Sequence, residues 1–433
     1  MSTEQFGPLP PRFIELKKEI AASHPDFEKR VTAAWADLLK ALEASTAEIA
    51  TQSSEIVPQV DFTELGTLSQ SARDNIRRRG CVVIRNVVPD EEATAWKDDL
   101  KEYVKKNPVE GFPEEDKQFF QLYWTKSQIR ARGHPNVLSA SAWLNNFYHV
   151  KSGAKPDDVD LSTPLSYADR FRMRHPGNIW DRFPPHIDGG AIERWEDETF
   201  RQCFADILSG NWREHDPYDL VNRINARSSL YGRPNQATVF RTYQGWLALS
   251  EIAPSQGTLQ VFPGVLLSNS YLILRPFFTL LSDDPTVLYD PTNWKYDISE
   301  PDFPGIYSFE GAFIGPRPNT KTHPNLQLEK TMVSIPKVSP GDMVFWHCDV
   351  IHAVEVEHTG AEDSSVMYIG AVPYTPANAS YIARQKENFE KGIPPPDYPK
   401  WVGEAGFVGV GTPSDIDTPI GLKAMGFPVQ ASA

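Results

Sequence analysis

Short apolar segments separated by glycine and proline turns fill the chain from about residue 167 onward, and they constrain its fold more than any other feature. Such segments are typical of β-strands, and many of them in succession indicate a double-sheet β architecture. The 37 prolines of the chain favour long, irregular loops between the strands. The predicted strands cover residues 168–175, 238–249, 258–262, 332–336, 342–347 and 365–372.

Helices are predicted on both sides of this β-rich region. Residues 1–60 carry apolar side chains near helical spacing and are rich in alanine and glutamate. Residues 79–88 have the β-branched composition of a buried strand, and Pro89-Asp90 then opens a helix. A last helix is expected over residues 380–391, where Gly392 ends it. The chain is therefore expected to be an α+β protein with a mainly β core.

Charge and cysteine content exclude several classes of protein. The formal net charge of −14 argues against nucleic acid and anionic membranes as partners. The three cysteines form no CxxC pair, which argues against a disulfide scaffold or a thiolate zinc site and favours a reducing compartment. No secretory signal and no apolar run of about 18 residues is visible. A cytoplasmic protein is expected, and the sequence does not indicate its oligomeric state.

The segment FPPHIDGG suggests a metal site. It places His186 and Asp188 two residues apart, so on a strand both side chains would face the same side. A third ligand, His352, is available in PGDMVFWHCDVIHAVE, which spans residues 340–355. Two histidines and one carboxylate on one face of Fe(II) leave the opposite face open for other ligands. The competing interpretation is a turn in which Asp188 caps the backbone and His186 is merely packed.

Four motifs in sequence order resemble the phytanoyl-CoA-dioxygenase-like branch of the Fe(II)/2-oxoglutarate oxygenases. They are His186-Ile-Asp188, Trp246-Leu-Ala-Leu249, Gly257-Thr-Leu-Gln-Val-Phe-Pro-Gly264, and Gly341-Asp-Met-Val-Phe-Trp-His347 followed by His352. Segments such as YADRFRMRHPG and RQKENFEKGIPPPDYP are more similar still to a microbial oxygenase-like family catalogued as a domain of unknown function. The resemblance covers nearly the whole chain after residue 60.

This resemblance implies a double-stranded β-helix, or cupin-like jelly roll, with helices around it. The expected organisation is an N-terminal helical extension over residues 1–60 and one oxygenase domain over 61–433, with the jelly-roll core at about 167–375. By the family pattern, His352 rather than His347 binds the metal. Asp349 either orients a ligand histidine or caps a turn.

The 2-oxoglutarate carboxylate requires a cation, preferably arginine. Relatives carry an arginine shortly after the distal histidine, but residues 353–375 contain no arginine or lysine. The preferred candidates elsewhere in the chain are Arg174 and Arg241, followed by Arg172 and Arg384, and Trp246 is a candidate wall of the pocket. For each arginine, an exposed or surface-paired side chain is the simpler interpretation.

The function implied is a non-haem oxygenase that uses Fe(II), 2-oxoglutarate and O2 to oxidise a C–H bond, by hydroxylation, desaturation or ring closure, with release of succinate and CO2. No catalytic side chain beyond the metal ligands is expected. The substrate would be a small polar metabolite, with a free amino acid as the leading candidate. The alternatives are a cupin-type isomerase or hydrolase that does not use 2-oxoglutarate, and a non-catalytic sensor of small molecules.

Overall fold

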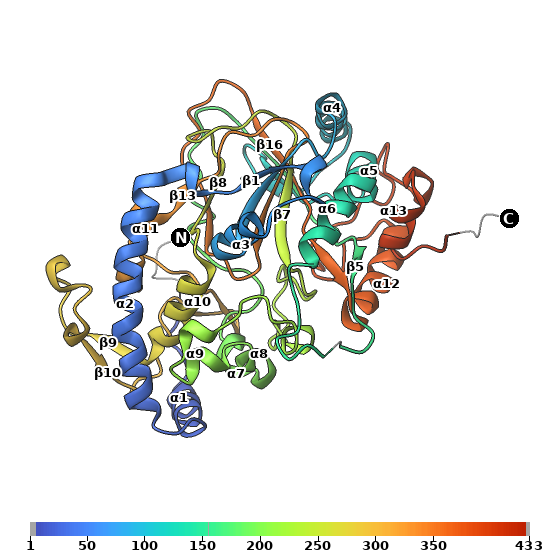
Figure 1. The fold of residues 1–433 in the computed structure, drawn as a ribbon. Coiled ribbons are helices and arrows are strands. Elements are labelled where there is room, and N and C mark those ends of the chain that lie inside the picture. Colours follow the sequence, from blue (N-terminus) through green and yellow to red (C-terminus); the bar gives the residue numbers. More distant parts are fainter. Residues whose placement is uncertain (1–5, 155, 430–433) are drawn as a thin grey trace.

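A computed structural model describes residues 6–154 and 156–429, and an eight-stranded sheet is its largest element (Figure 1). Only β1 and β2 pair in parallel, and the other neighbouring strands are antiparallel. Strands β7 and β14 are buried along their whole length, so the middle of the sheet is covered on both faces. In spatial order the strands are β1 (Gln59–Asp61), β2 (Cys81–Arg85), β14 (Met343–His347), β7 (Tyr243–Ala248), β16 (Ser364–Tyr368), β6 (Phe171–Arg174), β4 (Phe119–Phe120) and β3 (Gly111–Phe112).

A second, three-stranded antiparallel sheet carries one of the predicted metal ligands. Its order is β13 (Val333–Ser334), β8 (Leu259–Val261) and β15 (His352–Val354). Side chains of both sheets line one cavity, which is described below. Three further strand pairs are β5 (Asp160–Leu165) with β17 (Val372–Tyr374), β9 (Phe278–Leu280) with β10 (Trp294–Tyr296), and β11 (Tyr307–Phe309) with β12 (Ala312–Ile314).

Helices pack around the sheets, and those at the two chain ends lie on opposite sides of the molecule (Figure 1). The long helix α2 buries an apolar stripe in which Trp35 stacks on Tyr271 and Phe278, with ring centroids 5.1 and 4.5 Å apart. The helices are α1 (Arg12–Ala22), α2 (Phe27–Gln52), α3 (Gln70–Arg79), α4 (Asp90–Lys106), α5 (Lys126–Gly133), α6 (Pro135–Asn145), α7 (Glu193–Glu196), α8 (Glu198–Gln202), α9 (Ala205–Leu208), α10 (Val265–Leu274), α11 (Leu328–Thr331), α12 (Pro376–Lys391) and α13 (Pro419–Ala424).

The coarse prediction of an α+β fold is confirmed, and its largest sheet is antiparallel apart from the β1–β2 pair. The strand over 79–88 and the helix after it are β2 and α4, and Gly392 ends α12 with a φ of 65° that suits glycine. The strand predicted over 365–372 is instead two strands, because the chain leaves the large sheet after Tyr368 and β17 pairs with β5.

The closure of the sheets into a jelly roll stays a prediction. The division at residue 60 is also untested, although that boundary falls inside β1, a strand of the main sheet. The outermost residues of both predicted segments, 1–5 and 430–433, lie outside the described residues. No helix in the described part of the chain is both long and apolar enough to cross a membrane.

Candidate active site

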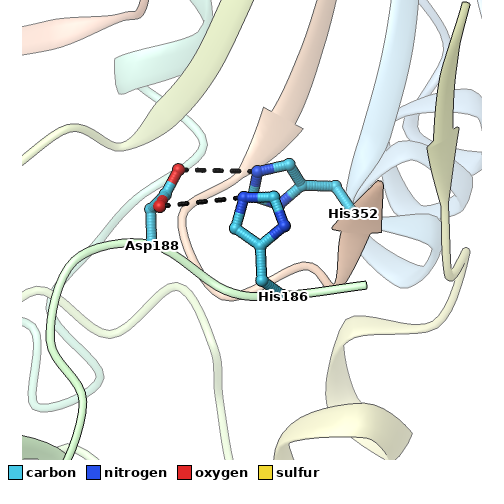
Figure 2. Close-up of side chains that lie close together, drawn as sticks. All are labelled: His186, Asp188 and His352. Atoms are coloured by element: carbon cyan, nitrogen blue, oxygen red, sulfur yellow. Dashed lines mark ion pairs between the residues drawn. The ribbon is translucent and has the colours of Figure 1, made fainter. Parts of the chain in front are cut away.

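His186, Asp188 and His352 converge on one point, although more than 160 residues separate the first and last of them in sequence (Figure 2). Asp188 Oδ1 lies 3.8 Å from His186 Nε2, and its Oδ2 lies 3.5 Å from His352 Nε2. One potential ligand atom from each residue lies within 4.8 Å of those of the other two. These distances suit a single ion bound between the three side chains.

An isolated β-bridge brings the two histidines together. His186 N donates to His352 O, and His352 N donates to His186 O, each over 2.9 Å. The sequence argument for a shared face assumed that the H-x-D pair lies on a strand, but apart from the bridge at His186 the segment is loop. Ile187 between the two ligands is only 3% exposed and belongs to the hydrophobic core.

Hydrogen bonds to the backbone orient both imidazoles. Nδ1 of His186 lies 2.7 Å from Pro184 O, and Nδ1 of His352 lies 3.1 Å from Val350 O. A carbonyl oxygen can only accept, so in the neutral rings Nδ1 carries the proton and Nε2 presents its lone pair to the shared point. Burial and the nearby His352 lower the pKa of His186 to about 4, so its neutral form prevails at neutral pH.

A buried cluster of charges ties the two ligand-bearing segments to each other. Arg194 donates to the carbonyl oxygen of Asp188 over 3.1 Å and pairs with Asp349 Oδ1 over 2.7 Å. Arg223 pairs with the other carboxylate oxygen of Asp349, which is three residues before His352. Asp349 therefore acts on the backbone around the site through Arg194, rather than directly on a ligand histidine as one sequence interpretation has it.

His347 lies apart from the three converging side chains. It is buried, its Nε2 hydrogen-bonds Tyr148 Oη, and its ring stacks on that of Tyr148 at 5.4 Å. His347, Cys348 and Asp349 also lie close enough together to share an ion. However, Asp349 already pairs with two arginines, and burial raises the pKa of the Cys348 thiol to about 11, which disfavours the thiolate that a metal requires.

A cavity of about 350 Å³ between the two sheets opens onto the three converging residues. Its walls include aromatic rings from the large sheet and its flanking loops, among them Phe119, Trp246, Trp346 and Tyr368. The charged groups of its lining are six arginines and two aspartates, apart from the two histidines. They are Arg170, Arg172, Arg182, Arg233, Arg241, Arg317, Asp169 and Asp188.

Comparison with known proteins identifies the family. The family model described as Gig2-like matches residues 7–427. The chain belongs to the Gig2-like family. The Escherichia coli (strain K12) protein YbiU, described as uncharacterized, is 30% identical to this Gig2-like chain over 393 residues, which cover 87% of each protein.

Solved structures agree with this assignment. The crystal structure of GlcNAc Inducible Gene 2, GIG2 (DUF1479), from Candida albicans is 31% identical and aligns with a TM-score of 0.86 over 99% of this chain and 92% of that one. The predicted resemblance to a family catalogued as a domain of unknown function is therefore confirmed. The carbocyclase SnoK, described as non-haem and α-ketoglutarate-dependent, aligns with a TM-score of only 0.38, and the phytanoyl-CoA-dioxygenase-like branch is not confirmed.

Three of the residues predicted for the co-substrate line the cavity of this Gig2-like protein: Arg172, Arg241 and Trp246. Arg172 is 2% exposed and donates to Gly257 O over 3.2 Å. Among the described residues, its Nε and Nη1 have no hydrogen-bond partner. A buried guanidinium with unused donors at a cavity wall is suited to bind a carboxylate.

Two predicted residues are misplaced for this role. Arg174 is fully buried outside the cavity lining, and its guanidinium donates to the carbonyl oxygens of Glu355, Asn178 and Val356. These hydrogen bonds tie the Arg174 guanidinium to the protein backbone. Arg384 is exposed on α12, where it packs over the ring of Tyr381. Both lie outside the lining of the cavity, so its geometry favours Arg172 over Arg174, and the residue that holds the co-substrate stays a prediction.

Sequence reasoning missed several polar groups of the cavity. Trp346 Nε1 and Gln121 Nε2 are buried donors that find no acceptor among the described residues. Arg233 and Arg317 were not singled out, although each begins an Arg-Pro-Asn triplet after a glycine-containing loop, at residues 233–235 and 317–319. That repeated triplet is the one local signal that could have identified them.

Proposed function

We propose that this Gig2-like protein is a non-haem Fe(II)/2-oxoglutarate-dependent oxygenase that oxidises a C–H bond of a small polar metabolite. The observation that carries the proposal is the convergence of two imidazole Nε2 atoms and one carboxylate at the wall of a cavity. Two histidines and a carboxylate with one open side are the ligand set of non-haem Fe(II) oxygenases.

The donor set fits ferrous iron. His186 and His352 would each bind the ion through Nε2, and Asp188 would bind it through one carboxylate oxygen. Nitrogen and oxygen donors without a thiolate suit Fe(II). The Asp188 side chain is 46% exposed toward its surroundings, so an ion and further ligands can reach it from the cavity.

The cavity also offers a site for the carboxylates of 2-oxoglutarate. Arg172 supplies a guanidinium with two unused donors, and Gln244 and Trp346 add single donors. Arg241, which also lines the cavity, adds positive charge. We assign Arg172 as the main anchor, in place of the missing arginine downstream of His352.

When bound together with 2-oxoglutarate and dioxygen, iron supplies the oxidising power for C–H cleavage, with succinate and CO2 as products. The protein itself orients the reactants and limits the access of water. The aromatic walls formed by Trp246, Trp346 and Tyr368 serve that second purpose, because they surround the site with apolar surface. No side chain is required as a nucleophile.

The decisive experiment is the anaerobic addition of Fe(II) and 2-oxoglutarate to metal-free protein. A weak visible charge-transfer band is expected for the wild type and should be absent in His352→Ala. His149→Ala is the matched control, because His149 is partly exposed, pairs with Asp216 over 2.8 Å and lies outside the cavity lining. No band in the wild type, or an undiminished band in a folded His352→Ala protein, would overturn the proposal; turnover without 2-oxoglutarate would favour a cupin-type metalloenzyme.

A further inference from the structure

Positive charge exceeds negative charge in the cavity, in contrast to the molecule as a whole. The formal net charge of the chain is −14, whereas six arginines and only two aspartates line the cavity. A ferrous ion and a doubly charged 2-oxoglutarate would cancel each other's charge. The excess of arginine would therefore persist in the loaded site, and it requires a further anion.

Arg317 is placed beside the metal ligands by a backbone hydrogen bond. Ile187 N, between the two ligands of the H-x-D segment, donates to Pro316 O over 3.0 Å. The following residue is therefore held next to the site, and its side chain lines the cavity. Arg317 N itself donates to Gly305 O over 2.8 Å, which anchors this loop on its other side.

Arg233 reaches the same region from a separate loop. Ser228 closes that loop, because its carbonyl accepts from Gln236 Nε2 and its hydroxyl donates to Ala237 O over 3.2 Å. Gly190, just after the metal-ligand segment, lies against this loop: a Cβ on Gly190 would come within 3.6 Å of Ser228 Cα. Arg233 thus extends into the cavity from a closed loop that packs on the H-x-D segment.

Within the described residues, neither Arg233 nor Arg317 forms an ion pair or a side-chain hydrogen bond, and Arg233 Nε is a buried donor without an acceptor. Burial lowers the pKa of both arginines, and the charge of Arg233 lowers that of Arg317 further. Asp188 is close but is a proposed metal ligand. Glu193, the other nearby acid, accepts hydrogen bonds from the backbone of Ala191 and Leu230.

We infer that Arg233 and Arg317 together bind an oxyanion of the substrate, a carboxylate or a phosphate group, and so hold the substrate beside the metal on the side of Asp188. This inference rests on the proposed function for its reaction, but the binding site itself does not depend on iron. Two guanidinium groups on independent loops would provide several charge-assisted donors for one oxyanion.

The same lining argues against an amine on the substrate. An ammonium group requires a carboxylate, and the cavity offers only Asp169 and Asp188. Asp169 already pairs with Arg170 over 2.9 Å, and Asp188 is directed at the metal site. The charge pattern therefore favours an anionic metabolite without an amine over the free amino acid expected from the sequence.

Binding to metal-free protein tests this inference without turnover. Inorganic phosphate, lactate and alanine would be titrated at constant ionic strength and followed by tryptophan fluorescence, since Trp246, Trp346 and Trp401 line the cavity. Lactate and alanine share a carbon skeleton, so they differ in whether a hydroxyl or an ammonium group is present. Saturable binding of phosphate or lactate is expected, with alanine weaker. Tighter binding of phosphate than of lactate would indicate a phosphorylated substrate, and the reverse would indicate a carboxylated one.

The double variant Arg233→Gln/Arg317→Gln should weaken anion binding by about tenfold or more, the loss expected for charge-assisted hydrogen bonds. Arg384→Gln is the control, because Arg384 is exposed and lies outside the cavity lining. Arg172→Gln should change the anion affinity by less than about twofold, since its role is assigned to 2-oxoglutarate.

Three results would overturn the inference: no saturable anion binding by the wild type, tighter binding of alanine than of lactate, or unchanged anion binding by a folded double variant. The iron and 2-oxoglutarate band of the double variant separates this inference from the proposed function. A normal band with lost anion binding supports both. If the wild type shows no band but still binds anions through these arginines, the proposed oxygenase function is wrong and the proposed anion site is supported.

Discussion

Two groups of buried or half-buried arginines in this protein differ in what balances their charge. Arg194 and Arg223 share the carboxylate of Asp349, which is 1% exposed. Arg172, Arg233 and Arg317 line the cavity, and none of them pairs with a carboxylate in the described part of the chain. A desolvated charge without a partner is costly, so the first group is complete within the protein, whereas a bound anion would complete the second, as we propose.

The largest expected effect concerns the complete group. Asp349→Asn would leave two buried guanidinium groups without a counter-charge, and it should lower the free energy of unfolding by about 3–5 kcal/mol. Urea unfolding followed by circular dichroism measures this. Asp37→Asn is the control, because its ion pair with Arg213 is exposed and its loss should cost at most about 1 kcal/mol. Equal effects for the two variants would show that burial does not distinguish these pairs.

Removal of an arginine from the second group (Arg172, Arg233 and Arg317) should weaken ligand binding rather than lower stability. Arg172→Gln should leave the stability of ligand-free protein within about 1 kcal/mol of wild type, because no ion pair is lost. It should weaken 2-oxoglutarate binding by about 10–100-fold, because a charge-assisted contact is lost. Titration of 2-oxoglutarate against anaerobic Fe(II)-loaded protein measures the affinity, with Arg384→Gln as control. A variant as unstable as Asp349→Asn would place Arg172 in the structural group instead.

The smallest effect, taken per unit of pH, concerns His347, the histidine next to Asp349 and its two arginines. Burial, which outweighs the nearby Asp349, lowers the pKa of His347 to about 3. Between about pH 6.5 and 3 the unfolded chain binds a proton that the folded protein does not. Stability should therefore fall as the pH falls through this window, by up to roughly 1.4 kcal/mol per pH unit from this group.

His347→Phe removes the side chain that binds this proton in the unfolded chain. The unfolding free energy of the variant should therefore depend less steeply on pH between pH 6 and 4. The slope is the informative quantity, because the variant also loses the hydrogen bond to Tyr148 and its absolute stability will change. An unchanged slope would mean that His347 takes up a proton in the folded protein despite its burial.

Local sequence pattern was sufficient to predict the strands and helices that bury their own apolar residues. The β-branched run of β2 and the glycine that ends α12 are examples, since propensity and burial agree there. Local sequence pattern was insufficient to predict the different roles of Arg172 and Arg174, which alternate on one strand. The strand ends at Arg174, and the Arg174 guanidinium donates hydrogen bonds to the backbone carbonyl oxygens of Asn178 and Val356. The neighbours that decide the role of each arginine come from distant segments.

The sequence by itself determined which side chains could meet a metal, because an H-x-D pair and a distal histidine carry their chemistry in residue identity and order. Tertiary structure alone decided how they meet: a β-bridge joins His186 to His352, and Asp188 follows His186 in a loop rather than on a strand. It also decided which arginines remain unbalanced. Whether a guanidinium is satisfied depends on acceptors from other parts of the chain, and only the packing of sheets and loops places those acceptors.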